Sequence, residues 1–196
     1  MNTVIIKYSA GNIGSVLNAL ERVGCQAIVS DDKDLIRSAD KIILPGVGHA
    51  RTAMNNLKNK GLDEVIRNLK SPILGICIGL QLMCKYSDEG NTECLGIFDT
   101  KVRKFEQQND MKVPHMGWNN IEPISGNPLF DGIDKKDFVY YVHSYYAELC
   151  GDAIAHTEYG VKYCAALQQD NFYALQFHPE KSGTVGERIL SNFLNL

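Results

Sequence analysis

The chain has 196 residues, a length that suits one domain able to bury a substantial core without disulfides or metal. Hydrophobic residues make up 44% and charged residues 22%, so the composition favours an ordinary globular class. The formal net charge of −3 argues against general affinity for nucleic acid or for an anionic membrane surface. We therefore expect a single domain over residues 1–196.

The amino terminus and the cysteines indicate in which cellular compartment the protein is expected. Residues 1–7 read as a first strand and lack the long apolar stretch of a signal peptide. No apolar run approaches the roughly 20 residues that span a bilayer. The 6 cysteines are scattered, with no Cys-x-x-Cys and no zinc-ligand spacing. We expect reduced thiols, a cytoplasmic location and no metal.

Strand-like and helix-like segments alternate through the first half of the chain. The predicted strands lie at residues 4–6, 26–29 and 41–44, and the predicted helices at 13–23, 53–60 and 62–69. This alternation indicates an α/β fold with a largely parallel or mixed central sheet flanked by helices.

Residues 71–86 form the most informative segment. A short apolar run leads into Gly75, Cys77 and Gly79 and continues as a helix-compatible stretch from Leu80 to Tyr86. The layout predicts a strand, a sharp turn and a helix, with glycines where a Cβ would clash. A lone cysteine is more often a buried packing residue, but this context favours Cys77 as a nucleophile. Cys84 is expected within the following helix.

After about residue 95 shorter strands dominate, which suggests hairpins or a mixed sheet region. The clearest later strands are residues 138–142, 165–168 and 173–177, and a closing helix carries apolar residues between 185 and 194.

A histidine and a carboxylate follow the strand at 173–177. The rigid Pro179 fixes the chain direction, so that Glu180 can turn back onto the imidazole of His178. A nucleophile, a base and an acid that orients the base form the logic of a catalytic triad. The other histidines lack this context; they are His49, His115, His143 and His156.

A cysteine nucleophile also needs donors for the oxyanion formed at the attacked carbonyl. The amide of Ile78, directly after Cys77, is suited to this. A second donor is expected from Val47 and Gly48, in the glycine-rich loop 45–48 at the end of a neighbouring strand. A tight turn with a purely structural role remains the alternative for this loop.

Residues 75–81 and 177–180 together resemble the class-I, triad-type glutamine amidotransferases. Further segments narrow the resemblance to the glutaminase subunits of imidazole glycerol phosphate synthases; these are residues 8–16, 45–48, 114–119, 141–146 and 176–183. That family more often has aspartate in place of Lys7 and arginine in place of Gly14, and neither position belongs to the triad.

The resemblance implies a mechanism. Cys77 attacks the side-chain amide of L-glutamine to give a γ-glutamyl thioester. His178 protonates the leaving ammonia and then activates water, while Glu180 orients the imidazole. The implied glutamine-binding residues are Gln81, Glu89, Ser144 and Tyr145. A polar helix residue and a solvated charge are the alternatives for Gln81 and Glu89.

It also implies a partner. The ammonia would pass through a sheltered channel to a cyclase subunit of barrel fold, which makes imidazole glycerol phosphate and AICAR in histidine biosynthesis. Asn12, Trp118 and Lys181 match positions that face this partner. The two subunits would form a heterodimer without a cofactor, and the isolated chain should be a poor glutaminase.

Three other interpretations stay open. A cysteine hydrolase would share Cys77 and His178 but need no partner. A regulatory subunit without turnover would not need the intact triad. An amidotransferase could serve anthranilate, aminodeoxychorismate or pyridoxal phosphate synthesis, or a sugar-modifying pathway. The segment around Trp118 argues against the first three of these synthases but not against the last.

Overall fold

The computed structural model describes residues 2–8, 12–107, 111–124 and 126–196. Among these residues, a twelve-stranded sheet runs through the molecule in the order β2-β1-β3-β4-β14-β13-β11-β7-β5-β6, with β12 beside β13 and β9 beside β12. Its parallel part contains β1 (Thr3–Ile6), β2 (Ala27–Ser30), β3 (Lys41–Leu44), β4 (Ile73–Ile76) and β14 (Phe172–Leu175).

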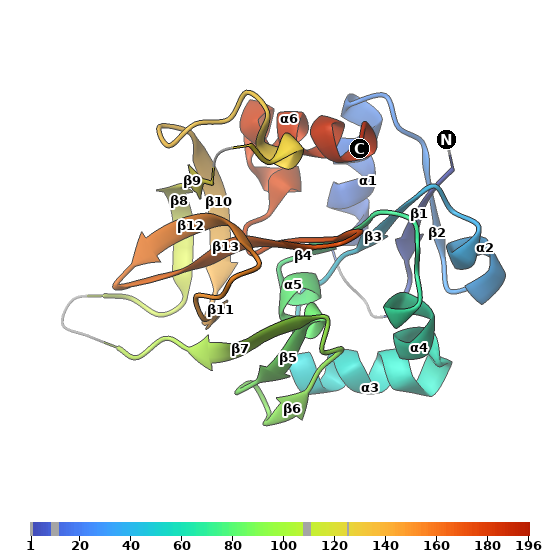
Figure 1. The fold of residues 1–196 in the computed structure, drawn as a ribbon, viewed down its shortest axis with the longest axis horizontal. Coiled ribbons are helices and arrows are strands. Elements are labelled where there is room, and N and C mark those ends of the chain that lie inside the picture. Colours follow the sequence, from blue (N-terminus) through green and yellow to red (C-terminus); the bar gives the residue numbers. More distant parts are fainter. Residues whose placement is uncertain (1, 9–11, 108–110, 125) are drawn as a thin grey trace.

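Helices cover both faces of the parallel strands (Figure 1). One face carries α1 (Ile13–Arg22) and α6 (Gly183–Leu194). The other carries α2 (Lys33–Arg37), α3 (Ala50–Lys60), α4 (Leu62–Arg67) and α5 (Ile78–Met83). In β1, Val4 and Ile6 join the core under α2–α5, whereas Ile5 joins the core under α1 and α6. Strands buried on both faces therefore read as continuous apolar runs.

The strands from residue 84 onward, apart from β14, are mostly antiparallel. This part of the chain extends the sheet with β5 (Cys84–Ser87), β6 (Thr92–Glu93), β7 (Phe98–Lys104), β9 (Glu122–Pro123), β11 (Tyr145–Ala147), β12 (Ala153–Tyr159) and β13 (Val161–Gln169). Two short 3₁₀ turns, η1 (Pro128–Phe130) and η2 (Pro179–Lys181), precede α6. The predicted α/β class and mixed sheet are confirmed.

Two further strands, β8 (His115–Asn120) and β10 (Phe138–His143), pair only with each other among the described residues and form an antiparallel ribbon beside the main sheet (Figure 1). We call it the β8–β10 ribbon. Its inner face is buried. Its outer face exposes three large apolar side chains, Met116 at 62%, Trp118 at 56% and Phe138 at 53%. One side of the ribbon is therefore buried, and the other presents apolar side chains that the described part of the chain leaves uncovered.

One predicted element is wrong. The helix after Cys77 ends at Met83, and Cys84 is extended, with φ −66° and ψ 173°, at the start of β5. The local sequence could continue the helix, but residues 84–87 form a strand instead because β5 pairs in parallel with β7, a strand more than ten residues further along the chain. Residues 9–11, part of the segment 8–16 that carries the family resemblance, lie outside the described residues.

Across the described ranges, no helix is both long and apolar enough to cross a membrane.

Candidate active site

Cys77 lies on the predicted elbow between β4 and α5. Its backbone has φ 52° and ψ −103°, a conformation that a non-glycine residue adopts only under strain. A Cβ at Gly79 would overlap the carbonyl oxygen of Leu44, so the helix can approach the strand only with glycine there. The Cys77 amide donates to the carbonyl of Leu175, at 2.7 Å. The turn is therefore held by close packing on one side and by β14 on the other.

The end of β14 brings the histidine to this elbow. Because Leu175 pairs with Ile76 in parallel register, the residues that follow β14 lie beside Cys77. Gln176 Nε2 is 3.9 Å from Cys77 Sγ. His178 Nδ1 is 2.8 Å from Glu180 Oε1, and both side chains are almost completely buried.

The ring of His178 is set up to carry a proton. Burial alone would lower its pKa, but the negative charge of Cys77, followed by the hydrogen bond and charge of Glu180, outweighs burial and raises the pKa of His178 to about 10. The ring is therefore an imidazolium at neutral pH. Its Nδ1 faces the Glu180 carboxylate, which leaves Nε2 for proton exchange with a reacting group.

Two buried polar atoms of this site have no hydrogen-bond partner within the described part of the chain, His178 Nε2 and Glu180 Oε2. Such atoms are rare in native structures and point to a site where a ligand or water completes the bonding. The free Nε2 is the nitrogen that a triad uses for chemistry.

Asn12 contributes a contact that sequence reasoning missed. Its Nδ2 donates to Glu180 Oε1 at 3.0 Å, so this oxygen accepts from both Asn12 and His178. The two hydrogen bonds orient the carboxylate. Asn12 precedes Glu180 by 168 residues, so no local pattern could reveal the pair. A place at a partner interface stays a prediction for Asn12.

The β8–β10 ribbon is bonded directly to the backbone of His178. The His178 amide donates to the carbonyl of Tyr140 at 2.9 Å. Ser182 Oγ accepts from the Tyr140 amide at 2.9 Å and donates to the His178 carbonyl at 2.7 Å. A displacement of β10 would therefore shift the imidazole.

The glycine-rich loop lies against the elbow, as expected. A Cβ at Gly46 would overlap the side chain of Ile78, so the two backbones approach closely. The hydroxyl of Tyr8 donates to the carbonyl of Pro45 at 2.7 Å. Beyond this fixed start, Val47 is 40% exposed and Gly48 has φ 111°. The loop is anchored at its first residues and exposed where the oxyanion donor is expected.

Three of the residues expected to bind glutamine lie together. Gln81 Nε2 donates to the carbonyl of Tyr145 at 3.1 Å. Glu89 Oε2 accepts from the Ala50 amide at 2.6 Å, at the amino end of α3. Burial, followed by the negative charge of Glu89, raises the pKa of Tyr145. The carbonyl of Ser144 accepts from the Phe105 amide at 3.0 Å. Gln81 and Glu89 thus also have structural partners.

A buried histidine–tyrosine chain supports this region. His143 Nδ1 is 2.7 Å from the Tyr145 carbonyl, which can only accept, so Nδ1 carries the hydrogen. Burial lowers the pKa of His143 to about 3, so the ring is neutral and its Nε2 accepts from the Tyr163 hydroxyl at 3.2 Å. The carbonyl that holds Gln81 is therefore fixed from behind by His143.

The same series of hydrogen bonds continues to the β8–β10 ribbon. His115 Nδ1 is 3.1 Å from the Tyr163 hydroxyl, and its Nε2 is 3.4 Å from Asn119 Nδ2, which can only donate. Burial lowers the pKa of His115 to about 4, so this neutral ring carries its hydrogen on Nδ1 and donates to Tyr163. The hydrogen bonds run in one direction from Asn119 to Tyr145. Sequence reasoning treated His115 and His143 only as rivals of His178, because their partners are distant in the chain.

The other two residues expected to face a partner share one exposed cluster. Trp118 lies opposite Tyr140 in the ribbon, with ring centroids 6.0 Å apart. Lys181 Nζ is 5.8 Å from the centroid of the Tyr140 ring, within cation–π range. Trp118 and Lys181 thus flank Tyr140, whose backbone contacts His178.

Comparisons with known proteins agree with this geometry. The family model for class-I glutamine amidotransferases matches residues 4–196. Imidazole glycerol phosphate synthase subunit HisH of Bacteroides thetaiotaomicron is 53% identical over 100% of both chains. The same subunit of Idiomarina loihiensis is 42% identical over 100% of this chain and 98% of its own. A crystal structure of a glutamine amidotransferase is 18% identical and shares the fold, with a TM-score of 0.76 over 98% of this chain and 97% of that one. The chain belongs to the class-I glutamine amidotransferase family.

Proposed function

We propose that residues 1–196 form one amidotransferase domain, the glutaminase subunit of an imidazole glycerol phosphate synthase. It hydrolyses L-glutamine to glutamate and ammonia and passes the ammonia to a barrel-fold cyclase subunit in histidine biosynthesis, in the cytoplasm. The observation that carries the proposal is the buried His178–Glu180 pair beside the Cys77 elbow, in a chain 53% identical to one subunit of that synthase.

The proposed reaction follows from the geometry. The Cys77 sulfur attacks the carboxamide carbon of glutamine, and the amides of Ile78 and of the Val47–Gly48 segment stabilise the oxyanion. His178 Nε2, which has no partner among the described residues, donates its proton to the leaving ammonia. The neutral ring then takes a proton from water, which hydrolyses the thioester to glutamate. Glu180 and Asn12 keep the ring oriented.

The partner is proposed to bind the outer face of the β8–β10 ribbon. Exposed Met116, Trp118 and Phe138 form an apolar surface of the kind that protein partners cover. Lys181 adds a positive charge at the edge of this surface. Because the Asn12 amide already holds Glu180, a partner that also contacts Asn12 would act directly on the triad carboxylate.

We further propose that the partner activates the glutaminase through the loop 46–48. The start of the loop is anchored at Pro45 and Gly46, while Val47 is exposed and Gly48 has a backbone conformation suited to glycine. The Val47 peptide can therefore reorient at modest cost. One misdirected oxyanion donor would lower the rate by about 10²–10³-fold. The cyclase loaded with its own ligand would favour the competent orientation.

The experiment is to measure glutamate release at saturating glutamine by the isolated chain, the bare complex and the ligand-loaded complex. The proposal expects turnover to rise in this order. Equal turnover in all three would remove the switch but leave the triad. Glutamine hydrolysis without any stimulation by a barrel cyclase, or stimulation only by a sugar-modifying partner, would favour the alternative hydrolase or the alternative amidotransferase.

A further inference from the structure

Two cysteines outside the proposed active site lie within reach of each other. Cys164 is in β13, and Cys150 is in the turn between β11 and β12. Their Sγ atoms are 4.0 Å apart. Both are free thiols, and a disulfide would require an S–S distance of about 2.05 Å. The sulfurs are thus in contact but unbonded.

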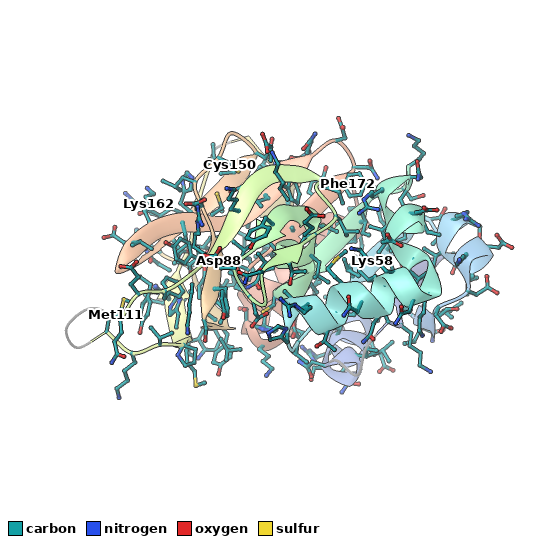
Figure 2. All side chains as sticks on the ribbon, turned by 90° about the horizontal axis from the view of Figure 1, so that it is seen from below. Lys58, Asp88, Met111, Cys150, Lys162 and Phe172 are labelled. Carbon is teal, nitrogen blue, oxygen red and sulfur yellow. The ribbon has the colours of Figure 1, made fainter. Side chains whose placement is uncertain are left out.

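The two thiols differ in mobility and access. Cys164 is completely buried and is fixed by strand pairing with Ala147 on one side and His156 on the other. Its Sγ donates to the carbonyl of Glu148 at 3.2 Å. Cys150 is half-buried in a turn, next to the faint orange strands of Figure 2 that include β13. The approach needed for a bond would therefore fall on the turn that carries Cys150.

The two thiols also differ in acidity. The hydrogen bond between the two sulfurs opposes burial and lowers the pKa of Cys150 to about 7, with help from the Asp152 backbone and the Thr100 hydroxyl. The same hydrogen bond, together with burial, raises the pKa of Cys164. About half of Cys150 is therefore thiolate at pH 7, so Cys150 is the thiol of this pair that reacts first. By contrast, burial raises the pKa of Cys94 to about 12.

We propose that Cys150 and Cys164 form a reversible disulfide in response to peroxide. The Cys150 thiolate attacks one oxygen of hydrogen peroxide, the O–O bond breaks, and hydroxide leaves and is protonated to water. The Cys164 thiol loses its proton and attacks the resulting sulfenic sulfur, and the S–O bond breaks to release a second water. Two thiols lose two electrons and peroxide becomes two waters. A dithiol reductant reverses the bond.

The Cys150–Cys164 disulfide would affect the residues proposed to bind glutamine. The turn that must move follows β11, a strand of 3 residues whose Tyr145 carbonyl accepts from Gln81 and His143. The site is separate from Cys77, because Cys164 belongs to the core under α2–α5 and Cys77 to the core under α1 and α6. Among the described residues, no group of three ligands suited to a metal surrounds the pair. We therefore treat the pair as a dithiol.

The test uses peptide mapping of the full chain after treatment with hydrogen peroxide and alkylation of the remaining thiols. Trypsin cuts after Lys162 and separates two peptides, residues 137–162 with Cys150 and residues 163–181 with Cys164, each containing one cysteine. We expect these peptides to be linked after peroxide and separate after dithiothreitol. At pH 7, Cys150 should alkylate at least about 100-fold faster than Cys94.

Variants make the outcome specific. Cys164→Ser should leave a sulfenic acid at Cys150 that dimedone traps, and Cys150→Ser should abolish the link. Cys94→Ser, which removes another buried thiol, should leave the link intact. The mapping is repeated in Cys77→Ser, so that oxidation at the elbow does not consume the peroxide. Irreversible oxidation of Cys150 while Cys164 still alkylates, or a link between other cysteines, would overturn the proposal.

Discussion

The proposed triad and the outer face of the β8–β10 ribbon differ in whether their side chains find partners within the protein. At the proposed triad, His178, Glu180 and Asn12 are joined by hydrogen bonds within the protein, and two buried atoms, His178 Nε2 and Glu180 Oε2, lack a partner among the described residues. On the outer face of the ribbon, Trp118 and its apolar neighbours are exposed. The first region is held together within one chain, whereas the second is, by our proposal, covered by a partner. Because Tyr140 and Ser182 bond the ribbon to His178, covering the second region can alter the first.

The largest expected effect is a loss of glutamine-dependent turnover that leaves partner binding by the ribbon intact. Cys77→Ala should lower glutamine-dependent turnover by roughly 10⁴-fold or more, because the covalent route is lost. Binding to the cyclase and synthesis driven by added ammonia should persist, because the ribbon is untouched. Steady-state assays with glutamine or ammonium chloride check this, with Cys94→Ala as a buried-thiol control. Turnover near the parent level in Cys77→Ala would remove Cys77 from the mechanism.

Within the triad, the acid should matter less than the base. His178→Ala removes the proton carrier, whereas Glu180→Gln keeps a side chain of the same shape beside Nδ1. We expect Glu180→Gln to retain roughly 10–100-fold more activity than His178→Ala. Single-turnover thioester formation measures the difference. Equal loss in the two variants would mean that Glu180 does more than orient the ring.

Breaking the ribbon surface should affect association rather than the triad. Trp118→Ala removes an exposed aromatic anchor and should weaken binding to the cyclase by about 30-fold, the effect of a typical interface hot spot. Titration calorimetry measures this. Ile28→Ala is the matched control, because Ile28 is 48% exposed on the edge strand β2, at the far end of the sheet. An equal loss of affinity in both variants would contradict the assignment of the ribbon as the docking face.

A smaller effect should follow from breaking the buried hydrogen bonds that join the ribbon to the residues expected to bind glutamine. Tyr163→Phe removes the hydroxyl between His115 and His143 and leaves two buried ring nitrogens unpaired. We expect a loss of about 1–3 kcal/mol in the free energy of unfolding and a modest rise in the KM for glutamine. Tyr159→Phe is the control, because its hydroxyl lies at the exposed end of its ring and bonds Lys112. Urea unfolding and glutaminase assays distinguish the two.

The smallest effect is a contrast in titration. From an ordinary value of 6.5, the pKa of His178 is raised to about 10, and the pKa values of His115 and His143 are lowered to about 4 and 3. Protonated His178 therefore adds stability below pH 6.5 that is lost as the pH rises through about 10. Neutral His115 and His143 add stability above pH 6.5 that is lost as the pH falls towards 4 and 3. Titration of the imidazole protons by NMR should give midpoints on opposite sides of 6.5, and midpoints clustered near 6.5 would refute the contrast.

What the sequence predicts well is local. The elbow glycines, the strand before Cys77 and the His-Pro-Glu turn are encoded within a few residues, and their elements appear as expected. By contrast, Cys84 lies in a strand because β5 pairs with β7. The contact of Asn12 with Glu180 depends on the arrangement of the whole sheet. The series of hydrogen bonds from Asn119 to Tyr145 joins residues of four different strands. Periodicity and motifs carry no information about such contacts between distant segments.

The position of β14 has a consequence for the order of assembly. This strand lies between β4 and β13 in the middle of the sheet, yet it follows every other described strand in the chain. Until residues 172–175 arrive, β4 has an open edge, and the amide of Cys77 lacks its acceptor on Leu175. Closing a contact across about a hundred residues is slow compared with local folding. We therefore expect Cys77 to be held in its strained turn only once β14 has joined the sheet, so that a partly folded chain would carry the cysteine without the elbow geometry.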